Sequence, residues 1–147
     1  MRTSQSTKKG TVMLKILPIQ SKETQEEICK KCNVTYRPEL VAYAASVDEE
    51  LVGICQFKLT AEGGFLYDIA TVVGHKEDAE CSDFEALFVM GRGTLNFIDL
   101  CGVHRAYFKG ENPDGRLLRA IGFRENEDGI FEINLEGFFT DHCHEHS

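Results

Sequence analysis

The chain has 147 residues, a length that suits one domain with its own hydrophobic core. Its formal net charge at pH 7 is −8, which argues against nucleic acid and anionic membrane surfaces as partners, because both attract basic proteins. No apolar run is long enough to span a bilayer, and the start MRTSQSTKKG lacks the apolar core of a secretory signal. We therefore expect a cytoplasmic protein whose six cysteines are free thiols.

We expect a single domain over residues 11–139, with flexible tails over residues 1–10 and 140–147, the second rich in histidine. The first half of this domain predicts strands, with one short amphipathic helix among them. The predicted elements are a strand over 11–19, a helix over 22–32, and strands over 40–47, 51–59 and 65–73. The polar run DEE (48–50) and the pair GG (63–64) supply the two tight turns between the last three strands.

The segment Ser82–Val103 predicts one long amphipathic helix. Its apolar positions recur at the three-and-four spacing that places side chains on one helix face: Phe84, Leu87, Phe88, Gly91, Leu95 and Ile98. Ser82 and Glu85 have the spacing of a capping box, and Gly102 stands where a left-handed cap would end the helix. Since strand-like runs lie on both sides, we expect a crossover helix packed on a sheet.

The last third of the chain predicts short elements separated by strong turn residues. These elements are a strand over 104–109, a helix over 116–121 closed by Gly122, and a hairpin of strands over 123–125 and 130–135. The full order is β-α-β-β-β-α-β-α-β-β. It predicts an α/β (α+β) fold, in which helices flank a mixed, mostly antiparallel central sheet with a right-handed crossover.

Three stretches, taken together with their order, resemble the GNAT superfamily of acyl-CoA-dependent N-acetyltransferases. VAYAASVDEELVGICQFKL (41–59) is similar to the family's second and third strands, where a short acidic hairpin precedes a Val-Gly step. DLCGVHRAYFKGEN (99–112) resembles the end of the long helix, the fifth strand and the Asn that follows it. LLRAIGFREN (117–126) resembles the family's Leu-Gly-Phe stretch near the last helix. The resemblance spans residues 11 to about 137 and suggests a divergent member.

The resemblance implies a binding site for acetyl-CoA in a cleft where the fourth and fifth strands diverge. The pantetheine arm would pair with the backbone of the fourth strand, and the pyrophosphate would lie at the amino end of the long helix, where free N–H groups and the helix dipole attract anions. The residues expected to bind acetyl-CoA are Ala70, Thr71, Val72, Val73, Ser82 and Asn112.

The entrance to the long helix departs from the family pattern. It lacks the family's phosphate-binding loop, which begins with arginine or glutamine and contains glycines. Against one lysine it carries five carboxylates, namely Glu77, Asp78, Glu80, Asp83 and Glu85. Acids at a helix start are ordinary because they favour the dipole, but here they occupy the place that a pyrophosphate would need. We therefore expect weak binding of CoA. An alternative register would make residues 84–90 a strand and Gly91-Arg92-Gly93 the phosphate loop.

The catalytic groups of the family are only partly recognisable. Where many members have a tyrosine that protonates the leaving thiolate, this chain has Leu118. Asp68, in the middle of the fourth strand, is the best-placed carboxylate for a general base, because burial would raise its pKa. The other interpretation of Asp68 is a structural acid on the outer face of the strand.

Cys29 and Cys32 could bind zinc together with residues of the C-terminal tail, namely His142, Cys143, His144 and His146. No glycine knuckle frames the pair, so we expect no metal. Two hypotheses follow for the whole chain. It is an N-acetyltransferase that uses acetyl-CoA to modify a small-molecule or peptide amine, or it is a catalytically silent binding domain with the same fold. The aromatic pair Phe138-Phe139 suggests an edge cover or a dimer contact, so a homodimer is possible.

Overall fold

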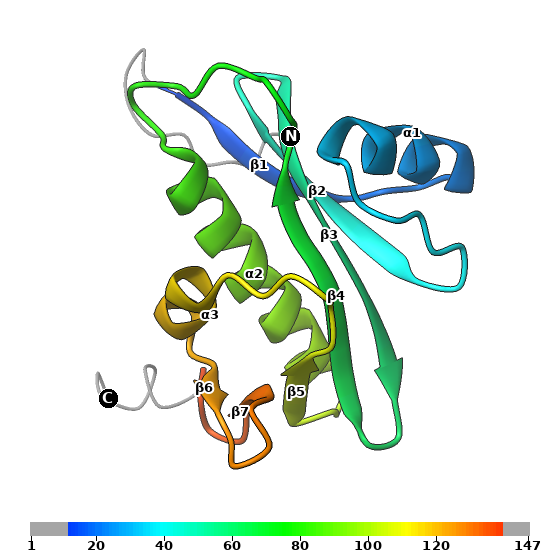
Figure 1. The fold of residues 1–147 in the computed structure, drawn as a ribbon, viewed down its shortest axis with the longest axis vertical. Coiled ribbons are helices and arrows are strands. Elements are labelled where there is room, and N and C mark those ends of the chain that lie inside the picture. The colour runs from blue at the N-terminus through cyan, green and yellow to red at the C-terminus, as the bar shows by residue number, and fades with distance from the viewer. Residues whose placement is uncertain (1–11, 140–147) are drawn as a thin grey trace.

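The computed structural model describes residues 12–139 (Figure 1). Within this range the chain forms a seven-stranded mixed sheet and three helices, in the predicted order. The elements are β1 (Leu14–Pro18), α1 (Lys22–Cys32), β2 (Val41–Val47), β3 (Glu50–Thr60), β4 (Gly63–Thr71), α2 (Asp83–Leu100), β5 (Arg105–Phe108), α3 (Gly115–Ile121), β6 (Arg124–Glu125) and β7 (Phe131–Asn134). The two predicted tails lie outside the described residues.

The strands lie in the order β1-β2-β3-β4-β5-β7-β6, and every neighbouring pair is antiparallel except β4 and β5. Helix α2 is the crossover that makes this one parallel pair possible. The turn between β2 and β3 places Asp48 and Glu49 at φ 51° and 74°, as a two-residue hairpin with the right twist requires. The predicted class of fold is confirmed.

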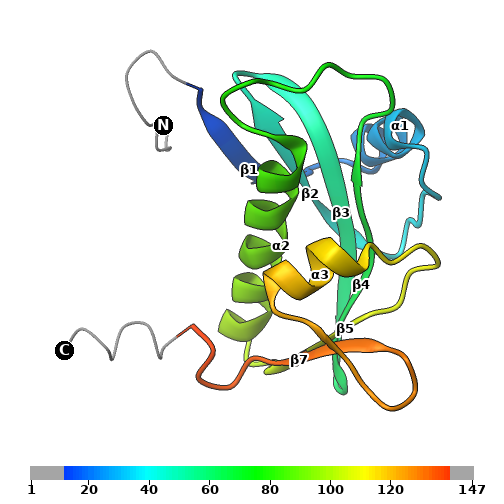
Figure 2. The ribbon, with the colours of Figure 1, turned by 60° about the vertical axis from the view of Figure 1, so that its left-hand side comes forward.

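Helices α2 and α3 cover one face of the sheet and α1 covers the other, as Figure 2 shows. The larger hydrophobic core lies between the sheet and α2, with Phe57, Leu66 and Met90 among its buried members. A smaller core under α1 contains Ile28 and Ile54. The division into two cores follows from helices that bury one apolar stripe each on opposite faces.

The predicted caps of α2 are both present. The Ser82 hydroxyl oxygen accepts a hydrogen bond from the Glu85 N–H at 3.0 Å, and Gly102 takes a left-handed φ of 89° just after the last turn. The predicted buried face was wrong in part. Phe84 and Phe88 are only half-buried, whereas Ala86, Met90 and Thr94 are fully buried. Thr94 contacts Cys55 of β3, whereas Phe84 lies beneath Arg116 of α3, so the stripe that faces the sheet is rotated from the predicted one.

The alternative phosphate-loop register is wrong, because Gly91 and Gly93 both lie inside α2. One of these two glycines allows a close approach, although not to the sheet. A Cβ at Gly91 would collide with Ile121, so this glycine lets α3 approach instead. Gly93 faces open space. Among the helices of residues 12–139, none combines the length and apolar character that a membrane crossing requires.

Candidate active-site cleft and helix entrance

Strands β4 and β5 diverge, as the resemblance implied. They pair only over three residues, Gly64–Leu66 with Ala106–Phe108, and the contact ends where Lys109 N–H donates to the Leu66 carbonyl at 2.7 Å. Strand β4 continues to Thr71 without this partner, and Figure 1 shows the short β5 beside only the lower part of β4. A bulge at Tyr67, which has no residue opposite it on β3, marks the point of divergence. Bulges bend a strand and redirect its side chains.

A cavity of about 390 Å³ lies at the divergence. It is lined by β4, the end of α1, α2 and the loop after β5. Five of the seven predicted site residues line it: Asp68, Ala70, Thr71, Val73 and Asn112. Val72 and Ser82 do not line it. Val72 lies just beyond β4 and its N–H donates to β3, and Ser82 caps α2.

The backbone of β4 offers fewer free groups to the cleft than its sequence suggests. Val72 N–H donates to Val52 on β3 at 2.8 Å, and Val73 N–H donates to the Lys31 carbonyl of α1 at 2.9 Å. Because the backbone groups of an antiparallel strand alternate in direction, those of Ala70 also point toward β3. The groups of Ile69 and Thr71 point the other way, toward the cleft. Sequence reasoning did not single out Ile69.

The side chain of Asp68 is part of a buried polar network on the α1 side of the sheet. Its Oδ2 accepts a hydrogen bond from the Gln56 side-chain amide of β3 at 2.7 Å. Gln56 in turn accepts one from the Gln25 side-chain amide of α1 at 2.9 Å. Burial raises the pKa of Asp68, a tendency that the hydrogen bond from Gln56 and the positive charge of Arg37 oppose. A carboxyl in this environment is better suited to take up a proton than an exposed one.

The two glutamines were missed in the sequence. Gln25 and Gln56 are 2% and 0% exposed, and a buried amide needs partners for all of its polar atoms. The pattern that could have revealed Gln56 is a single amide inside the apolar run GICQF, facing the single carboxylate of FLYDIA on the next strand.

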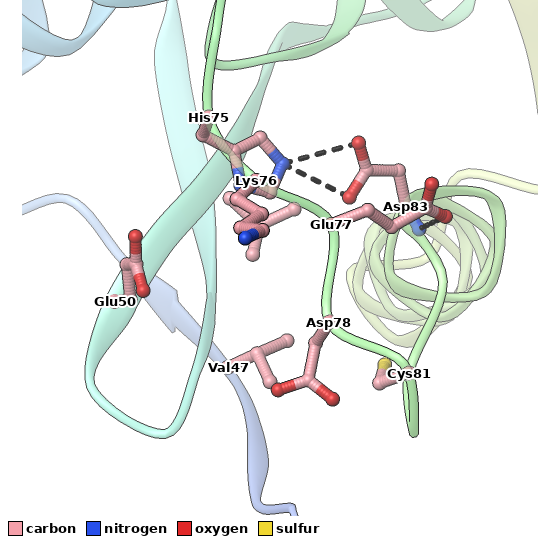
Figure 3. Close-up of a pocket in the computed structure, with 9 residues that line it drawn as sticks. Val47, Glu50, His75, Lys76, Glu77, Asp78, Cys81 and Asp83 are labelled. Atoms are coloured by element: carbon pink, nitrogen blue, oxygen red, sulfur yellow. Dashed lines mark hydrogen bonds and ion pairs between the residues drawn. The ribbon is translucent and has the colours of Figure 1, made fainter.

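The entrance to α2 is a second, separate cavity of about 260 Å³, and Figure 3 shows the side chains around it. Here the segment before the helix folds back over the helix start. Glu77 Oε2 accepts the Asp83 N–H at 2.7 Å, and the His75 ring nitrogen Nε2 lies 2.9 and 3.1 Å from the two carboxylate oxygens of Asp83. Gly74, with φ 81°, allows the chain to turn into this segment.

The helix start is therefore bound by the chain's own groups. The Asp83 N–H is taken by Glu77 and the Glu85 N–H by Ser82. Since a helix amino terminus attracts anions, the Glu77 carboxylate occupies a position of the kind that a phosphate would use elsewhere. Asp78 and Glu50 add negative charge to the same cavity, with Lys76 as the one lysine that lines it.

Two other predicted features involve buried side chains, of which only Cys32 reaches the wall of the cleft. Leu118 is 1% exposed and packs in the core, so α3 presents no proton donor at this position. Cys29 and Cys32 are buried, and burial raises their pKa to about 11 and about 12. Both thiols thus favour the protonated form, which binds metals poorly. The tail residues proposed to join them lie outside the described residues.

No family model and no curated protein matches the sequence. Among solved structures, the ribosomal-protein-S18-alanine N-acetyltransferase from Escherichia coli matches with a TM-score of 0.62 at 10% identity, over 84% of this chain and 94% of that one. E. coli YhhK bound to coenzyme A matches with a TM-score of 0.49 at 16% identity, over 84% of this chain and 98% of that one. This chain has a GNAT-like fold. At such low identity the likeness establishes the fold, and activity has to be argued from the cleft.

Proposed function

We propose that this protein is a GNAT-like N-acetyltransferase that moves the acetyl group of acetyl-CoA to an amine held between β4 and β5. The observation that carries the proposal is the cleft itself. An unpaired strand edge and a carboxyl with a raised pKa line the same cavity. In this proposal the pantetheine arm lies along the cleft-facing backbone groups of Ile69 and Thr71, with Asn112 on the opposite wall.

Asp68 acts as the general base. The acceptor arrives as an ammonium ion, and Asp68 takes one proton to give the neutral amine. The nitrogen lone pair attacks the thioester carbonyl carbon, the carbon–sulfur bond breaks, and the nitrogen loses a second proton to water to give the amide. Because Leu118 has no proton to give, the CoA thiolate leaves as the anion or takes its proton from water. Positioning of the two reactants supplies the remaining acceleration.

The charge of the cleft favours a cationic acceptor. Asp68 and Asp114 line it, and the charge of Glu111 is close enough to raise the pKa of Asp68. A small-molecule amine or an amino group on a peptide fits this chemistry. We further propose a cytoplasmic location, supported by the free thiols of all five cysteines within residues 12–139.

A second candidate function is a silent binding domain with this fold. It is favoured by Glu77, whose carboxylate covers the helix start where a CoA pyrophosphate would bind. A phosphate charge and an exposed carboxylate in close contact would repel one another by about 1 kcal/mol per pair, and a pyrophosphate brings two such charges.

Acetylation of a broad amine panel by the purified protein separates the two functions. The enzyme proposal expects turnover with at least one amine, and loss of that turnover in Asp68→Asn. Isothermal titration with acetyl-CoA supplies the binding measurement. Heat without turnover on any amine would support the binding domain, and no heat at millimolar acetyl-CoA would count against the enzyme.

A further inference from the structure

We propose that Gln56 is a positioning residue: its side-chain amide holds Asp68 in the cleft and ties that carboxylate to α1 and to the segment before β2. The role of Asp68 as a base rests on the proposed function, whereas the positioning by Gln56 does not. The inference begins with the burial of Gln56, which is 0% exposed in the middle of β3.

Every hydrogen-bonding position of the Gln56 amide is used. Its Nε2 donates to the Thr35 carbonyl at 2.8 Å and to Asp68 at 2.7 Å. Its Oε1 accepts from the Gln25 amide at 2.9 Å and from the Arg37 N–H at 3.3 Å. With two acceptors on one side and two donors on the other, the amide cannot flip without losing bonds on both sides. Its orientation is therefore fixed.

This fixed orientation decides which oxygen of Asp68 remains available. The Gln56 amide can only donate toward Asp68, so Oδ2 is held by a short hydrogen bond. For Oδ1 the structure of residues 12–139 shows no hydrogen bond. Asp68 lines the cleft cavity, so the amide leaves one oxygen of this partly buried carboxylate free to contact a ligand inside that cavity.

The same amide links Asp68 to the wall formed by α1 and the segment after it. Gln25, the partner of Gln56 on α1, also donates to the Leu40 carbonyl at 3.4 Å, and Lys22 donates to that carbonyl at 2.6 Å. A shift of this wall, for example when an acceptor binds, would be passed to Asp68 through one buried amide. Complete networks of this kind hold a single geometry because any loss leaves a buried group unpaired.

The test is the titration of the Asp68 side-chain carboxyl by carbon-13 NMR in wild type and Gln56→Met. Methionine keeps the volume of Gln56 and removes its polar atoms. Gln25→Met is the matched control, since it deletes an equally buried amide that does not touch Asp68. Other titratable groups that act on Asp68, or that Asp68 acts on, stay in place in both variants: Arg37, Glu111, Cys29, Cys32 and Cys55.

We expect Gln56→Met to raise the pKa of Asp68 by about 1, since a charge-assisted hydrogen bond to the carboxylate is lost, and Gln25→Met to raise it less. Equal values in the two variants would overturn the proposal. If Gln56→Met does not fold, the wild type still decides: the Gln56 side-chain amide must titrate with the Asp68 midpoint, and a pH-independent amide signal would overturn the proposal. Absence of acetylation in the amine assay would sink the proposed function and leave this result unchanged.

Discussion

The cleft between β4 and β5 and the entrance to α2 belong to one predicted ligand site, yet they differ in how their polar groups are used. In the cleft, the backbone of Ile69 and Thr71 faces an open cavity. At the entrance, the first helix donors are already bound to Glu77 and Ser82. The cleft keeps its donors available, whereas the entrance has paired two of the first three N–H groups of α2, those of Asp83 and Glu85, with its own side chains.

The difference follows from what forms each region. The cleft results from the topology, since a parallel β4–β5 pair that ends after three residues and a bulge at Tyr67 must leave an open edge. Removing it would require a rebuilt sheet. The entrance is a loop, and one carboxylate six residues before Asp83 is enough to cap the helix. We infer that the strand edge contributes more to ligand binding than the helix start does.

The largest effect should come from the cleft. Asp68→Asn keeps an oxygen that can accept the hydrogen bond from Gln56 but removes the base, so we expect a loss of about 100-fold or more in kcat/KM. Asp128→Asn, an exposed acid in the loop between β6 and β7, is the matched control. Unchanged turnover in Asp68→Asn would remove Asp68 from catalysis.

The entrance should give a smaller effect with the opposite sign. Glu77→Gln can still accept the Asp83 N–H through its amide oxygen but carries no charge, so acetyl-CoA should bind about fivefold more tightly, on the order of 1 kcal/mol for one exposed pair. Titration calorimetry measures this. Glu62→Gln, in the turn between β3 and β4, controls for net charge alone. A gain of the same size in both variants would show that Glu77 has no specific effect.

A further prediction concerns stability and pH. Because burial raises the pKa of Asp68, the folded state binds this proton more tightly than the unfolded chain does. Stability therefore falls as pH rises from the ordinary Asp range through the folded pKa, and the ionised carboxylate destabilises the protein above it. We expect Asp68→Asn to have a higher Tm than wild type at pH 7, with the difference disappearing below the ordinary Asp range. A lower Tm for the variant at pH 7 would contradict this sign.

Each region also contains one buried cysteine that can report on it. Cys32 lines the cleft and Cys81 lines the entrance, and burial raises their pKa to about 12 and about 11. Both should react slowly with iodoacetamide at pH 8, and among the cysteines of residues 12–139 the exposed Cys101 should react first. Saturating acetyl-CoA should slow alkylation of Cys32 by a further few-fold and leave Cys81 unaffected, as mass spectrometry of peptides would show. Protection of Cys81 instead would place the ligand at the entrance.

Much of the fold could be predicted because its periodic and capping patterns are local. The order of elements, the caps of α2 and the hairpin at Asp48 and Glu49 all depend on neighbours in sequence. The buried face of α2 was predicted less accurately, since Phe84 lies beneath Arg116 of α3, an element whose position the helical spacing of α2 does not reveal.

The site was harder to predict than the fold. Asp68 could be selected as a carboxylate inside an apolar strand, but its hydrogen-bond partner Gln56 lies on β3. The groups that hold Gln56 come from α1 and from the segment between α1 and β2. Similarly, the acidity of the entrance was plain from the sequence, whereas the contact of Glu77 with the Asp83 N–H depends on how the loop turns at Gly74. Long-range hydrogen bonds leave no periodic pattern.

The most direct test of the comparison is the affinity of the protein for acetyl-CoA and for S-acetylpantetheine, which has the same thioester arm but no nucleotide and no phosphates. If the strand edge binds the arm and the helix start contributes little, the two dissociation constants should agree within about tenfold, a difference of roughly 1.4 kcal/mol. Binding of acetyl-CoA more than about 100-fold tighter than that of S-acetylpantetheine would contradict the account, because it would require a working phosphate site.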